Sequence, residues 1–165
     1  MPIWGLSPFA VRASFAQVES QSHSEVVNAP VEVCFDTVVD FARYPEWFSA
    51  ISSARIIETN SENGQWKVAY ELDMVIKTIA YTLAYKGNRP GCLEWKLAEG
   101  DIKDVEGSYV FSALEPRLTE ARCTQTVDLG FWIPGLIKRG FERSALADSV
   151  AELKAAAEAR AGAGG

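Results

Sequence analysis

The sequence predicts an α+β fold in which a curved antiparallel sheet wraps around a long C-terminal helix. Three observations lead to this prediction. An early helical pattern, within residues 28–51, is interrupted by prolines. Apolar and polar residues then alternate through several segments between residues 55 and 129, as they do in strands with one buried face. From about Pro134 onward, apolar residues recur with the spacing of a single long helix.

The size and composition of the chain suit one domain without a nucleic-acid partner. Its 165 residues are 48% hydrophobic and 23% charged, enough to bury a single core. The formal net charge is −6, whereas nucleic-acid binders normally carry a basic patch. No apolar run in the sequence reaches the roughly 20 residues that a membrane span needs. We therefore expect a single domain over residues 20–160.

The first 19 residues are expected to form a disordered N-terminal tail. Residues 1–18 contain no acidic residue and one arginine, and Gly5, Ser7 and Pro8 interrupt their apolar residues. They therefore lack the continuous apolar core of a secretory signal. The alternative is a segment that targets the protein to an organelle.

The three cysteines, Cys34, Cys92 and Cys123, are scattered and odd in number. The sequence has no C-x-x-C motif and no cysteine–histidine cluster that would predict a disulfide framework or a zinc site. We interpret all three as reduced thiols in the core, which favours a reducing compartment, the cytoplasm. The sequence indicates neither a metal nor a cofactor.

The first predicted strand covers residues 20–28, and a helix follows it. Pro30 stands at the first helical position, where proline is tolerated. The apolar spacing extends this helix to about Ala42. Pro45 then ends it, because the residue before a proline, here Tyr44, is disfavoured in the helical region. A second short helix is expected over residues 45–51, so that two short helices follow the first strand.

Five or six further strands are expected, joined by short turns. On each, large apolar side chains alternate with small or charged ones, and the buried face carries most of the aromatic residues. The solvent face is expected to carry the carboxylates of Glu71, Asp73, Glu94, Asp104 and Glu106. This alternation is typical of an antiparallel meander, with about seven strands in total.

In the C-terminal helix, small residues form the central stripe of a wide apolar face: Gly140, Ser144, Ala147 and Ala151. Larger apolar residues flank this stripe, Leu146, Val150 and Leu153 on one side and Ile137 and Phe141 on the other. The stripe allows two interpretations. Either the helix lies close to the sheet, or space remains beneath the helix. Aromatic side chains or a ligand would have to fill such a space, because dry cores avoid voids.

Three stretches of the chain resemble the START-like, or SRPBCC, superfamily, and within it the polyketide cyclase/dehydrase and lipid transport family, which includes coenzyme Q-binding proteins. The stretches are residues 26–48 (VVNAPVEVCFDTVVDFARYPEWF), 93–111 (LEWKLAEGDIKDVEGSYVF) and 118–142 (LTEARCTQTVDLGFWIPGLIKRGFE). The resemblance implies a helix-grip fold of the START and Bet v 1 kind, with a deep apolar cavity between the sheet and the terminal helix. Members include lipid and sterol carriers, ubiquinone-binding proteins and aromatase/cyclases, so the fold alone does not decide the function.

The implied ligand-binding cavity would be lined by the buried face of the sheet and by the stripe. The predicted lining is Trp66, Tyr70, Met74, Tyr81, Trp95, Tyr109, Phe111, Gln125, Gly140, Ser144 and Ala147. The resemblance implies that the cavity opens near the break between the two short helices, so the entrance is predicted at Tyr44, Trp47 and Phe48, together with Phe131 and Trp132 of a later turn. Tyrosine and tryptophan suit such a partly wet rim, because each combines an apolar ring with a polar atom. The alternatives are that the first three plug the wide end of the sheet and that the last two tuck under the helix.

Few residues suggest catalysis. His23 is the only histidine and, with Glu25 on the same face of the first strand, is a weak candidate for a general base. The alternative is an exposed pair on an edge strand. Gln125 would either orient a ligand oxygen or bond a tyrosine hydroxyl. The sequence contains no phosphate loop, no G-x-S-x-G and no H-E-x-x-H motif.

The sequence therefore favours the binding or transport of a small hydrophobic ligand, such as a lipid, an isoprenoid quinone or a polyketide-like aromatic molecule. A cyclase or dehydratase that acts on polyketides is the first alternative, although an enzyme is the less favoured interpretation. A module that acts on another macromolecule is the second. We expect no cofactor, no nucleic-acid partner and only transient contact with a membrane, and the sequence names no protein partner.

Overall fold

The structure is a computed structural model, and it describes residues 20–74, 77–132 and 135–164. Residues 135–144 are described by their backbone alone. The predicted N-terminal tail, residues 1–19, lies outside the described residues, as do the side chains of Gly140 and Ser144.

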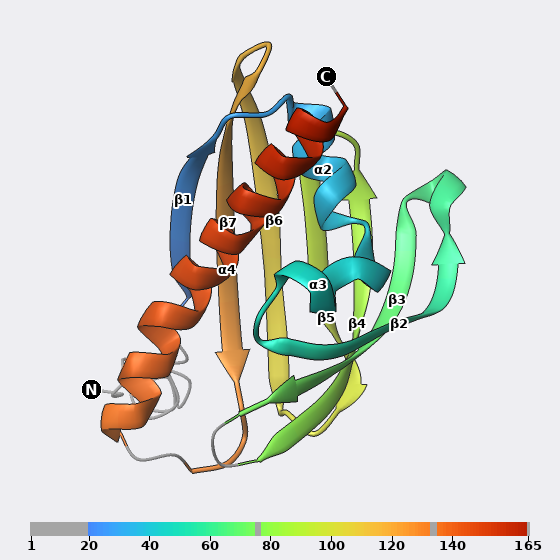
Figure 1. The fold of residues 1–165 in the computed structure, drawn as a ribbon. Coiled ribbons are helices and arrows are strands. Elements are labelled where there is room, and N and C mark those ends of the chain that lie inside the picture. Colours follow the sequence, from blue (N-terminus) through green and yellow to red (C-terminus); the bar gives the residue numbers. More distant parts are fainter. Residues whose placement is uncertain (1–19, 75–76, 133–134, 165) are drawn as a thin grey trace, which may run out of the picture.

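Within the described residues, a seven-stranded antiparallel sheet forms the larger layer (Figure 1). Its strands are β1 (Gln21–Val27), β2 (Ile51–Asn60), β3 (Gln65–Asp73), β4 (Thr78–Asn88), β5 (Cys92–Gly100), β6 (Asp104–Glu115) and β7 (Leu118–Asp128). Their order in space is β1-β7-β6-β5-β4-β3-β2, so each strand from β2 to β6 pairs with the next one along the chain. β1 pairs with β7 instead, and Gln21 lies opposite Gln125.

The helices cover one face of this sheet. The long helix α4 (Gly135–Ala163) runs obliquely across β1, β7 and β6, and α2 (Val31–Val38) packs beside it (Figure 1). The short helix α3 (Tyr44–Trp47) contacts β2 and α4. This arrangement confirms the predicted fold, a curved antiparallel sheet around a C-terminal helix with two short helices after the first strand.

The prediction for the first helix was wrong at its end. α2 stops at Val38, a separate 3₁₀ turn covers Phe41–Arg43, and α3 already begins at Tyr44. Tyr44 has helical backbone angles, φ −53° and ψ −42°, although a proline follows it. Its hydroxyl donates a hydrogen bond to the carbonyl of Val38, and its ring is buried. We infer that these tertiary contacts outweigh the local preference against a helical residue before Pro45.

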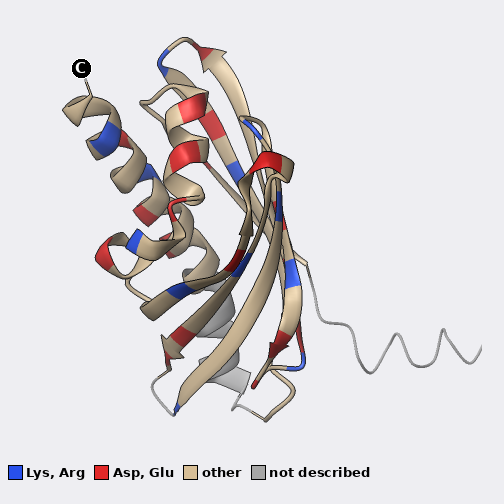
Figure 2. Ribbon diagram, turned by 90° about the vertical axis from the view of Figure 1, so that its right-hand side faces the viewer, with Lys and Arg blue, Asp and Glu red and all other residues tan. Residues whose placement is uncertain are grey.

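The strands alternate as the sequence predicts. Val68 and Tyr70 on β3 are buried, whereas Glu71 between the inner positions is exposed. The five carboxylates expected on the solvent face, Glu71, Asp73, Glu94, Asp104 and Glu106, are all exposed. Acidic and basic residues are interspersed along the strands and helices (Figure 2). The inner face is therefore left to apolar and aromatic side chains, which form the core with the helices.

Helix α4 buries one flank of its predicted apolar face, the side that carries Leu146, Val150 and Leu153. Its fully buried side chains include Val150, Leu153 and Ala157, and Leu146 is nearly so. Ala147 is only half-buried and Ala151 is exposed, so these two small residues do not form the middle of the buried face. The helix is turned toward its large branched residues, because these remove more apolar surface from water than alanine does.

Two carboxylates of α4 fix the helix to the segments on either side of α2 and α3. Glu158 accepts hydrogen bonds from the backbone N–H and the side-chain amide of Asn28, at 2.9 and 3.0 Å. Glu152 accepts from the backbone N–H of Ser49 at 3.1 Å and also from the Ser49 hydroxyl. The described helices include none that is long and apolar enough to cross a membrane.

Candidate functional site

A cavity of about 160 Å³ lies between the inner face of the sheet, the segment that joins α3 to β2, and α4. Every tyrosine of the chain lines it: Tyr44, Tyr70, Tyr81, Tyr85 and Tyr109. Aliphatic side chains fill the positions between them, Leu72, Ile79, Leu83 and Val105 from the sheet and Ile102 from the turn between β5 and β6. α4 contributes Ala145 and Ser149. The wall is therefore largely apolar, with hydroxyl groups at several points.

The aromatic rings around the cavity form a continuous series of contacts. Tyr44 stacks on Tyr70, with ring centroids 5.8 Å apart, and Tyr70 contacts Tyr81 at 5.7 Å. Tyr85 lies 6.1 Å from Trp95, which in turn lies 5.6 Å from Tyr109. Because each ring packs against a neighbour, this part of the wall is well ordered by its own contacts.

Several tyrosine hydroxyls have partners inside the protein. The hydroxyls of Tyr70 and Tyr85 lie 2.8 Å apart and share a hydrogen bond, and that of Tyr44 donates to Val38. Burial raises the pKa of Tyr81 to about 12 and raises those of the other four tyrosines well above the ordinary value of 10.0. All five are therefore neutral phenols at physiological pH.

The rest of the described wall is uncharged as well. Burial raises the pKa of the Cys123 thiol to about 12, so it is not a thiolate near neutral pH. Among the described lining residues there is no carboxylate, histidine, lysine or arginine. The wall can therefore bind uncharged apolar groups and exchange hydrogen bonds, but these residues supply no base near neutrality.

The predicted lining residues fall into three groups. Five of them line the cavity: Tyr70, Tyr81, Trp95, Tyr109 and Gln125. The other predicted sheet residues pack nearby, Trp66 against Phe41, Phe111 stacked on Tyr109 and Met74 partly buried after β3. Ala147 is half-buried, and the side chains of Gly140 and Ser144 are outside the described set.

The predicted entrance residues lie at different depths. Tyr44 is only 5% exposed and, with Phe48, lines the cavity itself. Trp47 packs on Tyr44 with ring centroids 4.9 Å apart. After β7, Phe131 is partly buried under the Lys77 ammonium group, whereas Trp132 is 83% exposed.

Sequence reasoning missed some of the wall. Ile79 and Leu83 share the inner face of β4 with Tyr81, so the strand alternation could have identified both. Ser149 had no such signal, because it is polar and lies outside the predicted stripe of small residues.

The only histidine lies away from this cavity. His23 on β1 is 3.1 Å from the Glu25 carboxylate, and each side chain is about a third exposed. Neither residue lines the cavity. The described residues also contain no group of histidine, cysteine, aspartate and glutamate side chains that could hold a metal ion.

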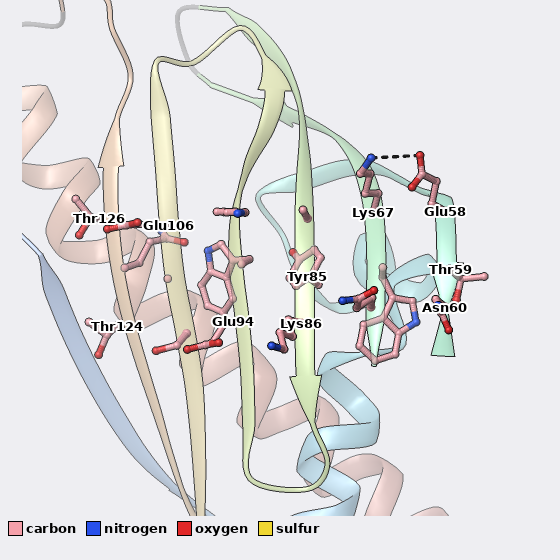
Figure 3. Close-up of a pocket in the computed structure, with 18 of the residues that line it drawn as sticks. Glu58, Thr59, Asn60, Lys67, Tyr85, Lys86, Glu94, Glu106, Thr124 and Thr126 are labelled. Carbon is pink, nitrogen blue, oxygen red and sulfur yellow. Dashed lines mark hydrogen bonds and ion pairs between the residues drawn. The ribbon is translucent and has the colours of Figure 1, made fainter. Parts of the chain in front are cut away.

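A second hollow is an open groove of about 830 Å³ on the outer face of the sheet (Figure 3). Lys67, Lys86 and Lys96 on its floor are matched by Glu58, Glu94 and Glu106, and the Lys67 ammonium lies 3.2 Å from the Glu58 carboxylate. Because opposite charges alternate along the groove, it has no strong field of one sign with which to attract a charged partner.

The family of the chain follows from its sequence. The profile of the family described as polyketide cyclase / dehydrase and lipid transport matches residues 27–154. The chain belongs to this family. The match covers the elements that surround the cavity, from the end of β1 into the buried part of α4. Among curated proteins, none matches the sequence significantly.

Solved structures of this kind share the fold. The Zhui aromatase/cyclase from Streptomyces sp. R1128 is 18% identical, with a TM-score of 0.73 over 86% of this chain and 94% of its own. A START superfamily protein from Mycobacterium smegmatis is 19% identical, with a TM-score of 0.71 over 88% and 99%. The protein TTHA0849 from Thermus thermophilus is 18% identical, with a TM-score of 0.73 over 88% and 99%. This family member therefore has a START-like fold, and at such identities the likeness shows the fold alone.

Proposed function

We propose that this protein binds a small, uncharged hydrophobic molecule in the cavity between the sheet and α4. The observation that carries the proposal is the composition of the cavity wall. The wall combines apolar side chains with neutral hydroxyl groups, and its described residues include no charged group. Ligand pockets typically combine an apolar surface with a few polar groups that set orientation. The family description, which includes lipid transport, supports the same function.

Removal of apolar surface from water would supply the binding energy. Each 200 Å² of apolar ligand surface buried contributes roughly 5 kcal/mol before the costs of association. The tyrosine rings are held by contacts with one another, so little ordering of the wall would oppose binding.

The size of the cavity limits the ligand. A volume of 160 Å³ corresponds to about five molecules of liquid water, below the roughly 300–1,000 Å³ of sites for drug-sized ligands. A molecule of one or two rings fits this space as it stands. A longer lipid, quinone or polyketide would require the segment around Phe48 to move away from α4.

We favour binding over the alternative of a cyclase or dehydratase. Such an enzyme needs titratable groups that converge on the substrate. The described wall offers tyrosines and a thiol whose pKa values burial raises, and His23 lies elsewhere. Turnover of a polyketide substrate with retention of activity in His23→Ala would support the enzyme and exclude its only histidine as the base.

The proposal can be tested on the purified protein. Native mass spectrometry and solvent extraction should recover one small hydrophobic molecule per chain. Ala145→Leu adds bulk to the cavity wall and should abolish this recovery, whereas Ala151→Leu, on the exposed face of the same helix, should retain it. The proposal fails if the wild-type protein takes up no hydrophobic molecule, even from an added lipid extract, or if Ala145→Leu recovers as much as Ala151→Leu.

A further inference from the structure

A buried donor at the cavity lacks a hydrogen-bond partner among the described residues. Trp95 is 7% exposed, and its Nε1–H is fully buried without a hydrogen-bond acceptor in the described part of the chain. An unpaired buried donor is costly and rare in native proteins. Other atoms of the Trp95 side chain line the cavity, so a small displacement of the indole would let a group inside the cavity supply the acceptor.

Gly107 allows the indole of Trp95 to lie across the sheet. On the inner face, Trp95 of β5, Gly107 of β6 and Gln125 of β7 form one row of directly paired residues. A Cβ atom built on Gly107 would lie 2.5 and 2.6 Å from Cζ2 and Cε2 of the indole. The edge of the ring that carries Nε1 therefore covers Gly107, in the direction of Gln125.

Gln125 is a half-buried amide of the same row that finds no partner among the described residues. Its side chain lines the cavity and makes no hydrogen bond with any described residue. The sequence left two roles for this amide, a bond to a tyrosine hydroxyl or to a ligand. The first is not formed, because the Gln125 side chain bonds none of the described tyrosine hydroxyls; those of Tyr70 and Tyr85 bond each other, and that of Tyr44 bonds the backbone.

We propose that the Trp95 Nε1–H and the Gln125 amide together bind a hydrogen-bond acceptor, a carbonyl or ether oxygen, of the ligand. This inference rests on the proposed function and specifies the ligand as an uncharged cyclic molecule with an oxygen at one end. An anion fits poorly, because the described wall holds no cation to balance it. The rings of Tyr109 and Tyr85, which contact Trp95, would receive the apolar part of the molecule.

Two bicyclic probes that differ only in one oxygen test this specificity. Indane is the hydrocarbon and 1-indanone is its ketone, and their dissociation constants are measured by calorimetry. Trp95→Phe and Gln125→Leu should each weaken 1-indanone relative to indane by roughly three- to tenfold, the effect of one lost hydrogen bond. Ile79→Val, an apolar change in the same wall, should weaken both probes by the same factor.

A second measurement uses the wild-type protein and so does not depend on the folding of the variants. The ¹⁵N–¹H resonance of the Trp95 indole, assigned through its proximity to the Gly107 protons, should move downfield with 1-indanone and remain in place with indane. An unmoved resonance, or an unchanged affinity ratio in a folded Trp95→Phe variant, overturns the assignment while binding in the cavity stands. In that case the Trp95 Nε1–H and the Gln125 amide bind only a structural water. If neither probe binds the wild-type protein, the proposed function fails, and this inference fails with it.

Discussion

At the scale of single residues, one glycine decides how the largest side chain of the cavity wall is placed. Gly107 of β6 pairs with Trp95 of β5. Because Gly107 has no side chain, the Trp95 indole lies directly on the backbone of Gly107. Any side chain at this position would occupy the same space as the ring and the carbonyl oxygen of Thr124. The position therefore tests how tightly the wall is packed.

Gly107→Ala should lower the free energy of unfolding by about 1–3 kcal/mol, the usual cost of overpacking a core. The new Cβ would lie 2.5 Å from the indole and 2.7 Å from the Thr124 carbonyl oxygen, and neither can move without disturbing the sheet. Urea unfolding followed by circular dichroism measures the change. Gly91→Ala is the matched control, because no atom lies within 4 Å of its Cβ position, and it should change stability by less than about 1 kcal/mol. Equal stability of the two variants would contradict the packing described here.

The paired hydroxyls of Tyr70 and Tyr85 allow a second prediction at this scale. Tyr70→Phe leaves the Tyr85 hydroxyl buried without its partner and should cost about 1–3 kcal/mol. Adding Tyr85→Phe removes that unpaired group, so the double variant should be less destabilised than the sum of the two single variants. Thermal or urea unfolding of the four proteins measures this cycle, and strictly additive losses would refute the pairing.

At the scale of elements, the segment between α3 and β2 is held to the helix layer by one carboxylate. Glu152 of α4 accepts hydrogen bonds from both the backbone and the hydroxyl of Ser49. The neighbouring Phe48 lines the cavity. Opening of the cavity at this side must therefore separate Ser49 from α4, which makes the Ser49–Glu152 contact the latch of the segment.

Glu152→Ala should accelerate the exchange of ligand and of backbone amide hydrogens in residues 47–51. A carboxylate that accepts two hydrogen bonds holds its partner more firmly than a neutral group does. Hydrogen exchange detected by mass spectrometry or NMR measures the effect. Glu158→Ala is the control, since Glu158 lies on the same helix but bonds Asn28, and it should accelerate exchange near Asn28 while leaving 47–51 protected. The same exchange pattern in both variants would mean that the latch is not specific.

At the scale of the whole molecule, all five tyrosines of the chain gather around one cavity. Because these five tyrosines are buried together, the stability of the fold depends on pH in the alkaline range. Burial raises the pKa of each tyrosine and of Cys123 above the ordinary values of 10.0 and 9.0. Between the unfolded and folded pKa values, the unfolded chain has released protons that the folded protein still holds, so stability falls as pH rises.

The protein should therefore keep its full stability below about pH 9 and should lose stability steadily as pH rises toward 12. The urea midpoint measured from pH 7 to 11 checks the trend. Tyrosinate absorbance supplies an independent signal, since no tyrosine should ionise until the protein unfolds, and then all five should ionise together. Gradual ionisation with a pKa near 10 in the folded protein would show that the rings are accessible to water.

The sequence could predict the sheet, the long helix and much of the cavity wall. Each of these depends on the spacing of apolar residues along the chain, which follows from having one face toward the core and the other toward solvent. It could also identify Tyr70, Tyr81, Trp95, Tyr109 and Gln125 as wall residues, since each lies on an inner face. It failed for the end of α2 and for the centre of the buried face of α4, where contacts distant in sequence decide the outcome. That the Trp95 donor finds no acceptor among the described residues could not be predicted either, because it depends on which acceptors reach a buried atom from other strands.

The pairing of β1 with β7 sets the order in which the domain can be completed on the ribosome. Ser22 and Thr124, neighbours across these strands, are 102 residues apart in the chain. β1 therefore has no partner strand until the whole meander has been synthesised, and pairings between strands so distant in sequence form slowly. α4 follows β7 in the chain, so the cavity is enclosed only after α4 has left the ribosome. A guest molecule would accordingly be loaded into the finished domain rather than during its synthesis.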